Sequence, residues 1–512
     1  MAGLLFTRLG HYALWDDEAG TALVAKGILR TGDTSVILDH GNICAYRSGI
    51  DIRDFCDRGM PPLSPYVTAA SFLLFGVNAW AARLPYALLG LATVGLILFW
   101  ARRERWLVLL VLSLGLLGNV SLILFLRQGR YYALTIFLSV AIAFVYWHGK
   151  ATPRNLLILA GLSILLFLSN YLNYLALYVC LAVDYILWKR KEWPFSWGKV
   201  LLLFGPQILL NGLAASIWNP FLTQHGGYET KSSLFDRFIL FYWYWRDMNA
   251  SEFMAIPLVF LALGFSLAQR RLWLVRGCVI SVIYIMVVAF IAPQVVDVLK
   301  EADIRYTSPV IPLDIALETG AICLVFQHRS VLAILLALIV FGTNLLNGGP
   351  LLDCGFRSTL VSYIGELIHP VPEPYTPTAN WINEHVPEGA SIWVEPGYAP
   401  YPLMFHAPRA LYAWQLMWPP RPDFAHLPII YFAGQKPPDY LITFGPWLDV
   451  VMKGMQLWNR PDARYTLVTT IPVFWKDCYR PELIWHKFEP IRNFDLQKQA
   501  VYIFQRVAPP PK

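Results

Sequence analysis

Long apolar runs separated by short loops fill residues 79–346, and they limit what this chain can fold into. A helix needs about 20 apolar residues to cross a hydrocarbon core about 30 Å thick. The runs therefore predict about ten or eleven membrane-spanning helices, and we place the shorter stretch 64–76 at the membrane interface. The best-defined spans are 79–101, 106–126, 131–148, 155–169, 171–188, 199–218, 253–269, 272–293, 306–327 and 330–346.

Composition supports this interpretation and indicates where the membrane-spanning part of the chain ends. Charged residues make up only 15% of the chain, whereas a soluble protein has about 25%. The deficit is uneven, because residues 355–512 read like a soluble domain. The net charge of +7 comes from basic residues between apolar spans. That pattern is typical of cytoplasmic loops and argues against nucleic-acid binding.

The basic residues also predict the orientation. Every second loop is basic, and basic loops face the cytoplasm. These residues are Arg102, Arg103, Arg105, Lys150, Arg154, Lys189, Arg190, Lys191, Lys199, Arg270, Arg271, Arg276 and Arg329. The remaining segments, together with the C-terminal domain, are then predicted to face outward: 1–78, 127–130, 169–171, 219–252 and 292–305.

The outward loop 1–78 raises a question about its export. Residues 1–15 are too short for a span or an ordinary signal peptide. Either the first span alone exports the loop, or a first helix is missing from this reading frame. We favour the second interpretation.

The cysteines agree with the predicted topology. Cys44, Cys56, Cys354 and Cys478 fall in outward segments. An oxidising compartment permits Cys44–Cys56 and Cys354–Cys478 disulfides, although four cysteines allow three pairings. Free thiols are an equally good interpretation.

The C-terminal region has a different sequence pattern, with short β-rich segments in place of long apolar runs. Thr376-Pro377 predicts the start of a helix that runs to His385. Four β-rich segments predict strands at 390–396, 439–445, 464–471 and 500–507. Strands mixed with helices indicate a small α/β domain. We therefore predict a polytopic α-helical membrane protein in three parts: outward loop 1–78, helical domain 79–346 and extracytoplasmic α/β domain 355–512.

An acidic motif opens the first outward loop. Asp16, Asp17 and Glu18 follow one another directly. Neighbouring like charges raise the pKa of a carboxyl and suit one of them to act as a base. On charge alone, a solvated acidic loop is the simpler interpretation.

Four motifs in order point to a family. The segment 17–33 (DEAGTALVAKGILRTGD) resembles the first extracytoplasmic loop of GT-C glycosyltransferases. The branch with protein O-mannosyltransferases and lipid A aminoarabinose transferases is the most similar. Segments 61–66 and 74–85 resemble the family's Pro-Pro motif and the Phe-Gly and Ala-Ala-Arg-Leu-Pro that follow it. Segment 127–134 resembles its second outward loop, and segment 305–312 resembles the Arg-Tyr that opens a late span. Gly59-Met60 replaces the family's Glu-Lys, and Tyr131 or Tyr132 replaces its Asp, so a subgroup with Arg-x-x-Arg-Tyr-Tyr fits better.

The resemblance implies a reaction and its partners. The family moves one sugar from a polyprenyl-phosphate donor to an acceptor hydroxyl on the non-cytoplasmic face. The acceptor is a lipid, a glycan or a protein, and direct displacement inverts the anomeric carbon. Asp17 becomes the candidate catalytic base, with Glu18 as its helper or metal-facing partner. The expected location is a bacterial inner membrane or a similar membrane, among membrane lipids and without nucleic acid.

Cationic side chains suit the leaving lipid phosphate. Arginine binds phosphate through two parallel hydrogen bonds, and fixed cations stabilise charge that develops in a transition state. Arginines at helix ends also reach toward lipid headgroups, and tyrosines there also serve as interfacial aromatics. The candidate substrate-binding residues are Arg127, Arg130, Tyr131, Arg305, Tyr306 and, with a structural role as the stronger alternative, Arg83.

Other outward segments give weaker signals. The aromatic run 241–247 suits sugar stacking, although we favour an amphipathic interface helix. Asn170 and Asn173 are candidate sugar contacts. A divalent metal ion near the acidic loop stays open, because His225 alone establishes no ligand set.

Two other classes of protein remain as alternatives. A transporter or flippase of lipid-linked sugars would need charged or broken helices at mid-membrane depth. The predicted spans carry few ionisable residues, with Asp184 near a cytoplasmic end. A non-catalytic assembly subunit would use the C-terminal domain as a binding module and would not need Asp17.

Overall fold

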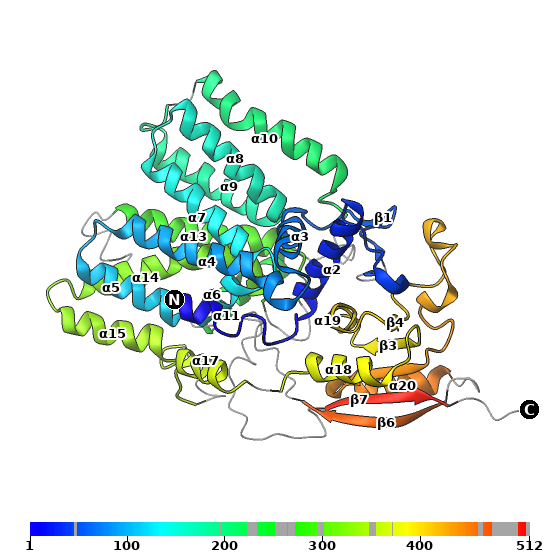
Figure 1. Cartoon of the computed structure of the whole chain (residues 1–512). Helices are drawn as coiled ribbons and strands as arrows, with labels where there is room; N and C mark the ends of the chain where they lie inside the picture. Colours follow the sequence, from blue (N-terminus) through cyan, green and yellow to red (C-terminus); the bar gives the residue numbers. More distant parts are fainter. Residues whose placement is uncertain are drawn as a thin grey trace, which may run out of the picture.

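The chain folds into a helical bundle with a small sheet beyond one end (Figure 1). The computed structural model describes residues 1–45, 49–194, 196–222, 233–250, 264, 272–294, 296, 302–347, 355–370, 372–458, 464–473 and 500–507. A continuous hydrophobic core runs from the bundle through the first loop and into the sheet.

The predicted spans correspond to helices. These are α4 (Ala79–Ala101), α5 (Trp106–Gly118), α6 (Val120–Arg127), α7 (Tyr132–His148), α8 (Pro153–Ser169), α9 (Tyr171–Asp184), α10 (Trp197–Ile217), α13 (Leu272–Ile291), α14 (Ile311–Val325) and α15 (Ser330–Gly342). In the described residues, 5 helices are long and apolar enough to cross a membrane, or 6 with one bent pair. Helices α7, α8 and α15 are apolar but shorter. The chain is an integral membrane protein, and the predicted span 253–269 lies, except for residue 264, outside the described residues.

The predicted span 106–126 is a broken helix. Helices α5 and α6 meet at a 66° bend. Asn119 lies at the break with φ −79° and ψ 90°, outside helical geometry. Its side chain accepts a hydrogen bond from the Leu122 amide at 2.8 Å and so caps α6. The predicted span 106–126 is therefore present as a bent pair of helices, because a capping asparagine starts the second helix.

Polar caps also start three other helices. The side chains of Asn78, Thr152 and Asn170 accept hydrogen bonds from amides in the first turns of α4, α8 and α9. Each cap satisfies a backbone donor that the helix itself leaves unpaired. Asn170, a candidate sugar contact, thus has a structural partner. Asn173 accepts a hydrogen bond from the Tyr284 hydroxyl at 3.1 Å in the core.

The first loop is built around two helices. After the short α1 (Ala2–Phe6), α2 (Asp16–Thr31) ends at Gly32, whose φ of 80° is left-handed and favours glycine. A two-stranded hairpin, β1 (Ile52–Arg53) and β2 (Cys56–Asp57), precedes α3 (Leu63–Phe75). Cys44 and Cys56 are free thiols. Cys354 and Cys478 lie outside the described residues.

The C-terminal sheet contains the four predicted strands and one more. Its order is β4-β3-β5-β7-β6, with β4–β3–β5 parallel and β7 antiparallel to both β5 and β6. The strands are β3 (Ser391–Glu395), β4 (Leu411–Tyr412), β5 (Tyr440–Phe444), β6 (Tyr465–Pro472) and β7 (Ala500–Arg506). The two-residue β4 is too short for a sequence pattern to predict. This fold confirms a helical membrane protein with a small C-terminal α/β region.

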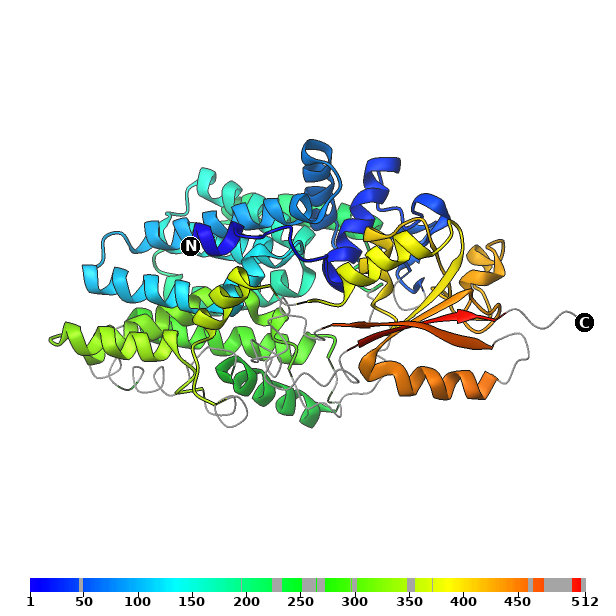
Figure 2. The ribbon, with the colours of Figure 1, turned by 60° about the horizontal axis from the view of Figure 1, so that its bottom comes forward.

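Helices cover both sides of this sheet. Figure 2 shows α18 (Tyr375–His385) and α19 (Pro400–His406) on one side and α20 (Leu448–Trp458) on the other. Helix α19 packs against α2 of the first loop. Asn42 adds reciprocal hydrogen bonds, donating to the Ala410 carbonyl at 2.9 Å and accepting from the Tyr412 amide at 2.8 Å. The sheet region is thereby attached to the loop that carries the acidic motif.

Candidate functional site

The acidic motif forms the first turn of α2. Asp16, Asp17 and Glu18 lie where the helix dipole favours negative charge. The Glu18 carboxylate accepts a hydrogen bond from the Trp15 amide at 3.4 Å. Asp16 and Glu18 are buried, whereas 12% of the Asp17 side chain stays accessible. The three carboxylates therefore have different surroundings despite their adjacent positions.

Two guanidinium groups hold Asp17. Its Oδ2 accepts a hydrogen bond from Arg305 Nη1 at 2.7 Å. Its Oδ1 lies 3.4 Å from Arg130 Nη1, which also donates to the Asp17 backbone carbonyl at 2.8 Å. Arg305 has a second acidic partner, Asp303, at 2.7 Å. We call this group of Asp17, Arg130, Arg305 and Asp303 the carboxylate–arginine cluster.

Segments that are distant in sequence build the cluster. Arg130 is 113 residues and Arg305 288 residues from Asp17. Arg130 lies in the turn between α6 and α7, and Arg305 lies in the 3₁₀ turn η5 (Ile304–Val310) that leads into α14. The residues 304–325 form one of the apolar spans. The cluster thus lies where a membrane span meets the first loop.

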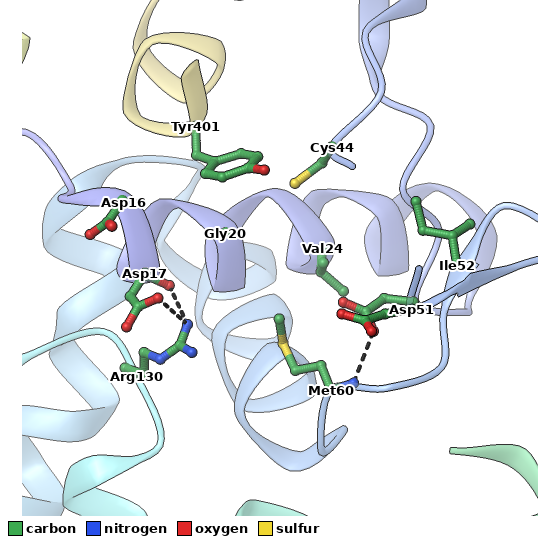
Figure 3. A pocket seen from close by; sticks show the side chains of 11 residues that line it. Asp16, Asp17, Gly20, Val24, Cys44, Asp51, Ile52, Met60, Arg130 and Tyr401 are labelled. Atoms are coloured by element: carbon green, nitrogen blue, oxygen red, sulfur yellow. Dashed lines mark hydrogen bonds and ion pairs between the residues drawn. The ribbon is translucent and has the colours of Figure 1, made fainter. Parts of the chain in front are cut away.

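A small cavity opens beside the cluster. Figure 3 shows Asp17 and Arg130 at one end and Asp51 and Met60 at the other, with Tyr401 of α19 above α2. About 30 Å³ is open to the centres of water-sized atoms, which is room for a water molecule or two and too little for a sugar. Its polar lining includes Asp16, Asp17, Cys44, Asp51, Asp57, Arg130 and Tyr401.

The cavity lining is strongly acidic. Burial raises the pKa of Asp57, although the amides of Met60 and Gly59 donate hydrogen bonds to its carboxylate at 2.9 and 3.0 Å. Nearby Asp33 is in the opposite situation, because its bidentate hydrogen bonds from Arg58 lower its pKa. Arg130 is the cationic residue in the lining.

Glu18 and Arg83 form a buried ion pair. Arg83 Nη2 lies 2.6 Å from Glu18 Oε2, and the side chains are 4% and 0% exposed. Arg83 also donates to the carbonyls of Leu9, Tyr12 and Ala13. Glu18 Oε1 accepts from the Gly129 amide at 2.6 Å. The pair therefore connects α2 and α4 to the N-terminal segment and to the turn that carries Arg130.

Arg127 has partners in other elements. It donates to the carbonyls of Leu4 at 3.0 Å and Thr7 at 2.9 Å, and to the hydroxyl of Tyr363. Tyr363 belongs to α17 (Thr359–Ile368). These contacts attach the N-terminal segment and α17 to the end of α6, so Arg127 differs from Arg130 although only two residues separate them.

Aromatic rings surround the cluster. The ring of Tyr131 lies 5.4 Å from the Arg130 guanidinium carbon, and that of Tyr306 lies 5.4 Å from the carbon of Arg305. The ring of Tyr132 lies against that of Tyr131 in a tilted arrangement, with centroids 4.5 Å apart. These distances allow cation–π attraction. The structure brings together the predicted residues Asp17, Arg130, Tyr131, Arg305 and Tyr306.

Sequence reasoning missed several residues around the cluster. Asp51 and Asp57 belong to the predicted outward loop, but their pattern does not distinguish them from other loop aspartates. Tyr401 comes from the C-terminal region and has no motif. The aromatic run 241–247 lies in α11 (Leu234–Ala250), where Tyr244 is buried. His225 lies outside the described residues.

The acidic lining does not fit a metal ion. Four aspartates line the cavity. In the described part of the chain, however, no three His, Cys, Asp or Glu side chains are grouped closely enough to bind the same metal ion. We therefore derive no reaction step through a metal ion.

The arrangement of helices and sheet defines a known class of membrane fold. No protein-family model matches the chain, and neither does any curated protein sequence. Its structure nevertheless has the GT-C glycosyltransferase fold. The solved structure of ArnT from Cupriavidus metallidurans in the apo state is similar with a TM-score of 0.57 and 13% identity, over 88% of this chain and 92% of that one.

Two further solved structures are similar. ArnT from the same organism bound to undecaprenyl phosphate gives a TM-score of 0.56 and 14% identity, over 98% of this chain and 96% of that one. An oligosaccharyltransferase from Archaeoglobus fulgidus gives a TM-score of 0.46 and 11% identity, over 88% of this chain and 66% of that one. At these identities the ArnT structures define the fold of the chain.

Proposed function

We propose that this protein is a membrane glycosyltransferase that moves a sugar from a polyprenyl phosphate to an acceptor hydroxyl. The observation that carries the proposal is the carboxylate–arginine cluster at the start of a span, with Asp17 between Arg130 and Arg305. A base and two cations are the groups that this transfer needs. The similar ArnT structure binds undecaprenyl phosphate, which supports a lipid donor of this chemistry.

The cluster supplies groups for each part of the reaction. Asp17 accepts the proton of the acceptor hydroxyl as its oxygen attacks the anomeric carbon. The bond between that carbon and the phosphate oxygen breaks, and the lipid phosphate leaves with its negative charge. Arg130 and Arg305 stabilise that charge. One displacement from the opposite face inverts the anomeric configuration.

In the described structure the arginines are paired with the base itself. A carboxylate that accepts hydrogen bonds from guanidinium groups is a weak base, because the charged form is stabilised. The donor phosphate competes for the same donors and binds arginine well. We infer that phosphate binding draws Arg130 and Arg305 away from Asp17. The base then becomes effective only when the donor is in place.

Glu18, Arg83 and Arg127 have supporting roles in this proposal. The buried Glu18–Arg83 pair fixes the first turn of α2 next to the turn that carries Arg130. Arg127 holds α1 and α17. Tyr131 and Tyr306 orient the guanidinium groups through their rings.

Donor turnover tests the proposal. Wild type and Asp17→Asn, purified in mild detergent, are given a panel of polyprenyl-phosphate sugars with membrane-extract acceptors, and released polyprenyl phosphate is quantified by mass spectrometry. We expect release by wild type and at least a hundredfold less by Asp17→Asn. Asp39→Asn, an exposed change in the same loop, is the control. Normal activity of Asp17→Asn contradicts the proposal.

One observation favours the transporter alternative. Asp314 and Glu318 are buried one turn apart in α14, within the span 304–325. Ionisable residues inside a membrane often mark a transport path. Asp184 instead pairs with Arg276 at 2.6 Å. The test follows a labelled lipid-linked sugar across the membrane of vesicles that contain the protein. Transport without product formation, lost in Glu318→Gln, would identify a transporter.

The proposed orientation follows the basic loops. The site and the C-terminal region are placed outside the cytoplasm, in a bacterial inner membrane or a similar membrane. The acceptor, a lipid, a glycan or a protein, then approaches from that side. Cysteine labelling with an impermeant reagent at Glu388→Cys, whose side chain is 65% exposed just before β3, tests this orientation in intact cells.

A further inference from the structure

Tyr244 is a buried residue to which the reaction above gives no role. It lies on α11 with 0% of its surface exposed. In the described part of the chain its hydroxyl has no hydrogen-bond partner. A buried tyrosine hydroxyl ordinarily has one, and leaving it without one is unfavourable. The position therefore indicates a partner that arrives with a ligand.

The surroundings of Tyr244 are the cluster itself. Helix α11 packs against α13 and η5, the turn that carries Arg305 and Tyr306. Burial raises the pKa of Tyr244 well above its usual value, and charge on Asp303 and on the phenol oxygen of Tyr306 adds to this, whereas the charge of Arg305 opposes it. The hydroxyl therefore keeps its proton at neutral pH and is available as a hydrogen-bond donor.

We propose that Tyr244 is a substrate-binding residue whose hydroxyl donates a hydrogen bond to a phosphate oxygen of the polyprenyl carrier, beside Arg305. This inference rests on the proposed function and adds a neutral donor to the two arginines. A phosphate offers several acceptor oxygens, so Arg305 and Tyr244 can bind it together. A guanidinium has no acceptor, so Arg305 cannot accept a hydrogen bond from the hydroxyl, whereas a phosphate oxygen can.

The packing of α11 against two candidate spans favours the phosphate over the sugar as the partner of Tyr244. The polyprenyl chain occupies the membrane, so the phosphate is the part of the donor closest to the spans. Tyr244 is buried on α11, which packs against α13 and η5, and both of these belong to candidate membrane spans. The cavity with Asp57 and Tyr401 is lined by residues of α2, α19 and the first loop, and Tyr244 is not among its lining residues.

The test measures binding of the lipid with and without a sugar. Wild type, Tyr244→Phe and the control Tyr242→Phe are titrated with undecaprenyl phosphate and with its sugar-linked form, and ligand-induced shifts of the unfolding temperature give the affinities. Tyr242 is on the same helix but 63% exposed. We expect Tyr244→Phe to bind both lipids about ten- to hundredfold more weakly, and Tyr242→Phe to match wild type.

The outcomes separate the inference from the function on which it rests. Removing an unpaired buried hydroxyl does not destabilise the free protein, so the unfolding temperature of unliganded Tyr244→Phe should equal or exceed that of wild type. Equal affinity in Tyr244→Phe overturns the inference alone. Weaker binding of only the sugar-linked lipid overturns the phosphate assignment. If wild type binds neither lipid, both the inference and the proposed function fail.

Discussion

Asp17→Asn should tighten the binding of sugar-free polyprenyl phosphate while it abolishes turnover. Asp17 and the lipid phosphate compete for the same guanidinium groups, so a neutral residue at this position leaves Arg130 and Arg305 more available. A variant that only damages the site would bind the lipid more weakly. Tighter lipid binding together with lost turnover therefore distinguishes the competition between Asp17 and the phosphate from simple damage to the site.

The size of the effect follows from the contacts of Asp17. The hydrogen bond from Arg305 at 2.7 Å joins two charged groups, and such a bond contributes about 1.5–3 kcal/mol. The 3.4 Å contact with Arg130 adds less. If binding breaks the first bond, its removal strengthens lipid affinity about ten- to hundredfold, at about 1.4 kcal/mol for each factor of ten. Asp303 stays paired with Arg305 in the variant and limits the gain.

The assay is an equilibrium titration with undecaprenyl phosphate in detergent or lipid nanodiscs. Asp39→Asn makes the same change of charge on an exposed side chain of the same loop and should leave the affinity unchanged. An affinity of Asp17→Asn equal to or below that of wild type would refute the exchange of arginine partners. Tightening in both variants would show that net charge alone is responsible.

Three further predictions concern stability, each measured by thermal unfolding in detergent. Glu18→Gln leaves Arg83 buried without its counter-charge and should lower stability by about 3–5 kcal/mol, whereas Asp17→Asn should unfold near wild type; the reverse order contradicts these roles. Burial and the charge of Arg83 lower the pKa of His406 from 6.5 to about 4. Between these pH values the unfolded chain binds a proton that the folded chain does not, so the free energy of unfolding should fall by about 3 kcal/mol as the pH drops from 6.5 to 4. His406→Gln should make stability less dependent on pH in this range. Glu318→Met removes a buried carboxyl oxygen that has no hydrogen-bond partner in the described residues and should raise stability by about 1–3 kcal/mol; a loss of lipid transport in this variant would instead support the transporter.

Local composition predicted the elements well. Membrane burial acts on each apolar run separately, so the segments that became α4, α9, α10 and α13 were recognisable without knowledge of their neighbours. The strands β3, β5, β6 and β7 were recognisable from their β-branched and aromatic residues. The break at Asn119 was missed, because an asparagine inside an apolar run does not reveal by itself whether it caps a helix.

The roles of the arginines depended on distant partners. Arg127, Arg130 and Arg305 look alike in the sequence, since each lies at an end of a predicted span. Arg127 binds the N-terminal segment and α17, whereas the other two bind Asp17. The separation of 65 positions between Glu18 and Arg83 likewise concealed their pairing. Asp314 and Glu318 were overlooked inside a span that was assigned from its apolar residues.

The hydrogen bonds between Asn42 and the β4 region restrict how such chains can change in evolution. They join residues 368 and 370 positions apart, and the His406 ring accepts a hydrogen bond from the Leu14 amide three residues before Asp17. A C-terminal region transplanted from another protein would lose these attachments and remove Tyr401 from the cavity wall. Recombination at the last span would therefore disable the chain, so its two ends must change together by small steps.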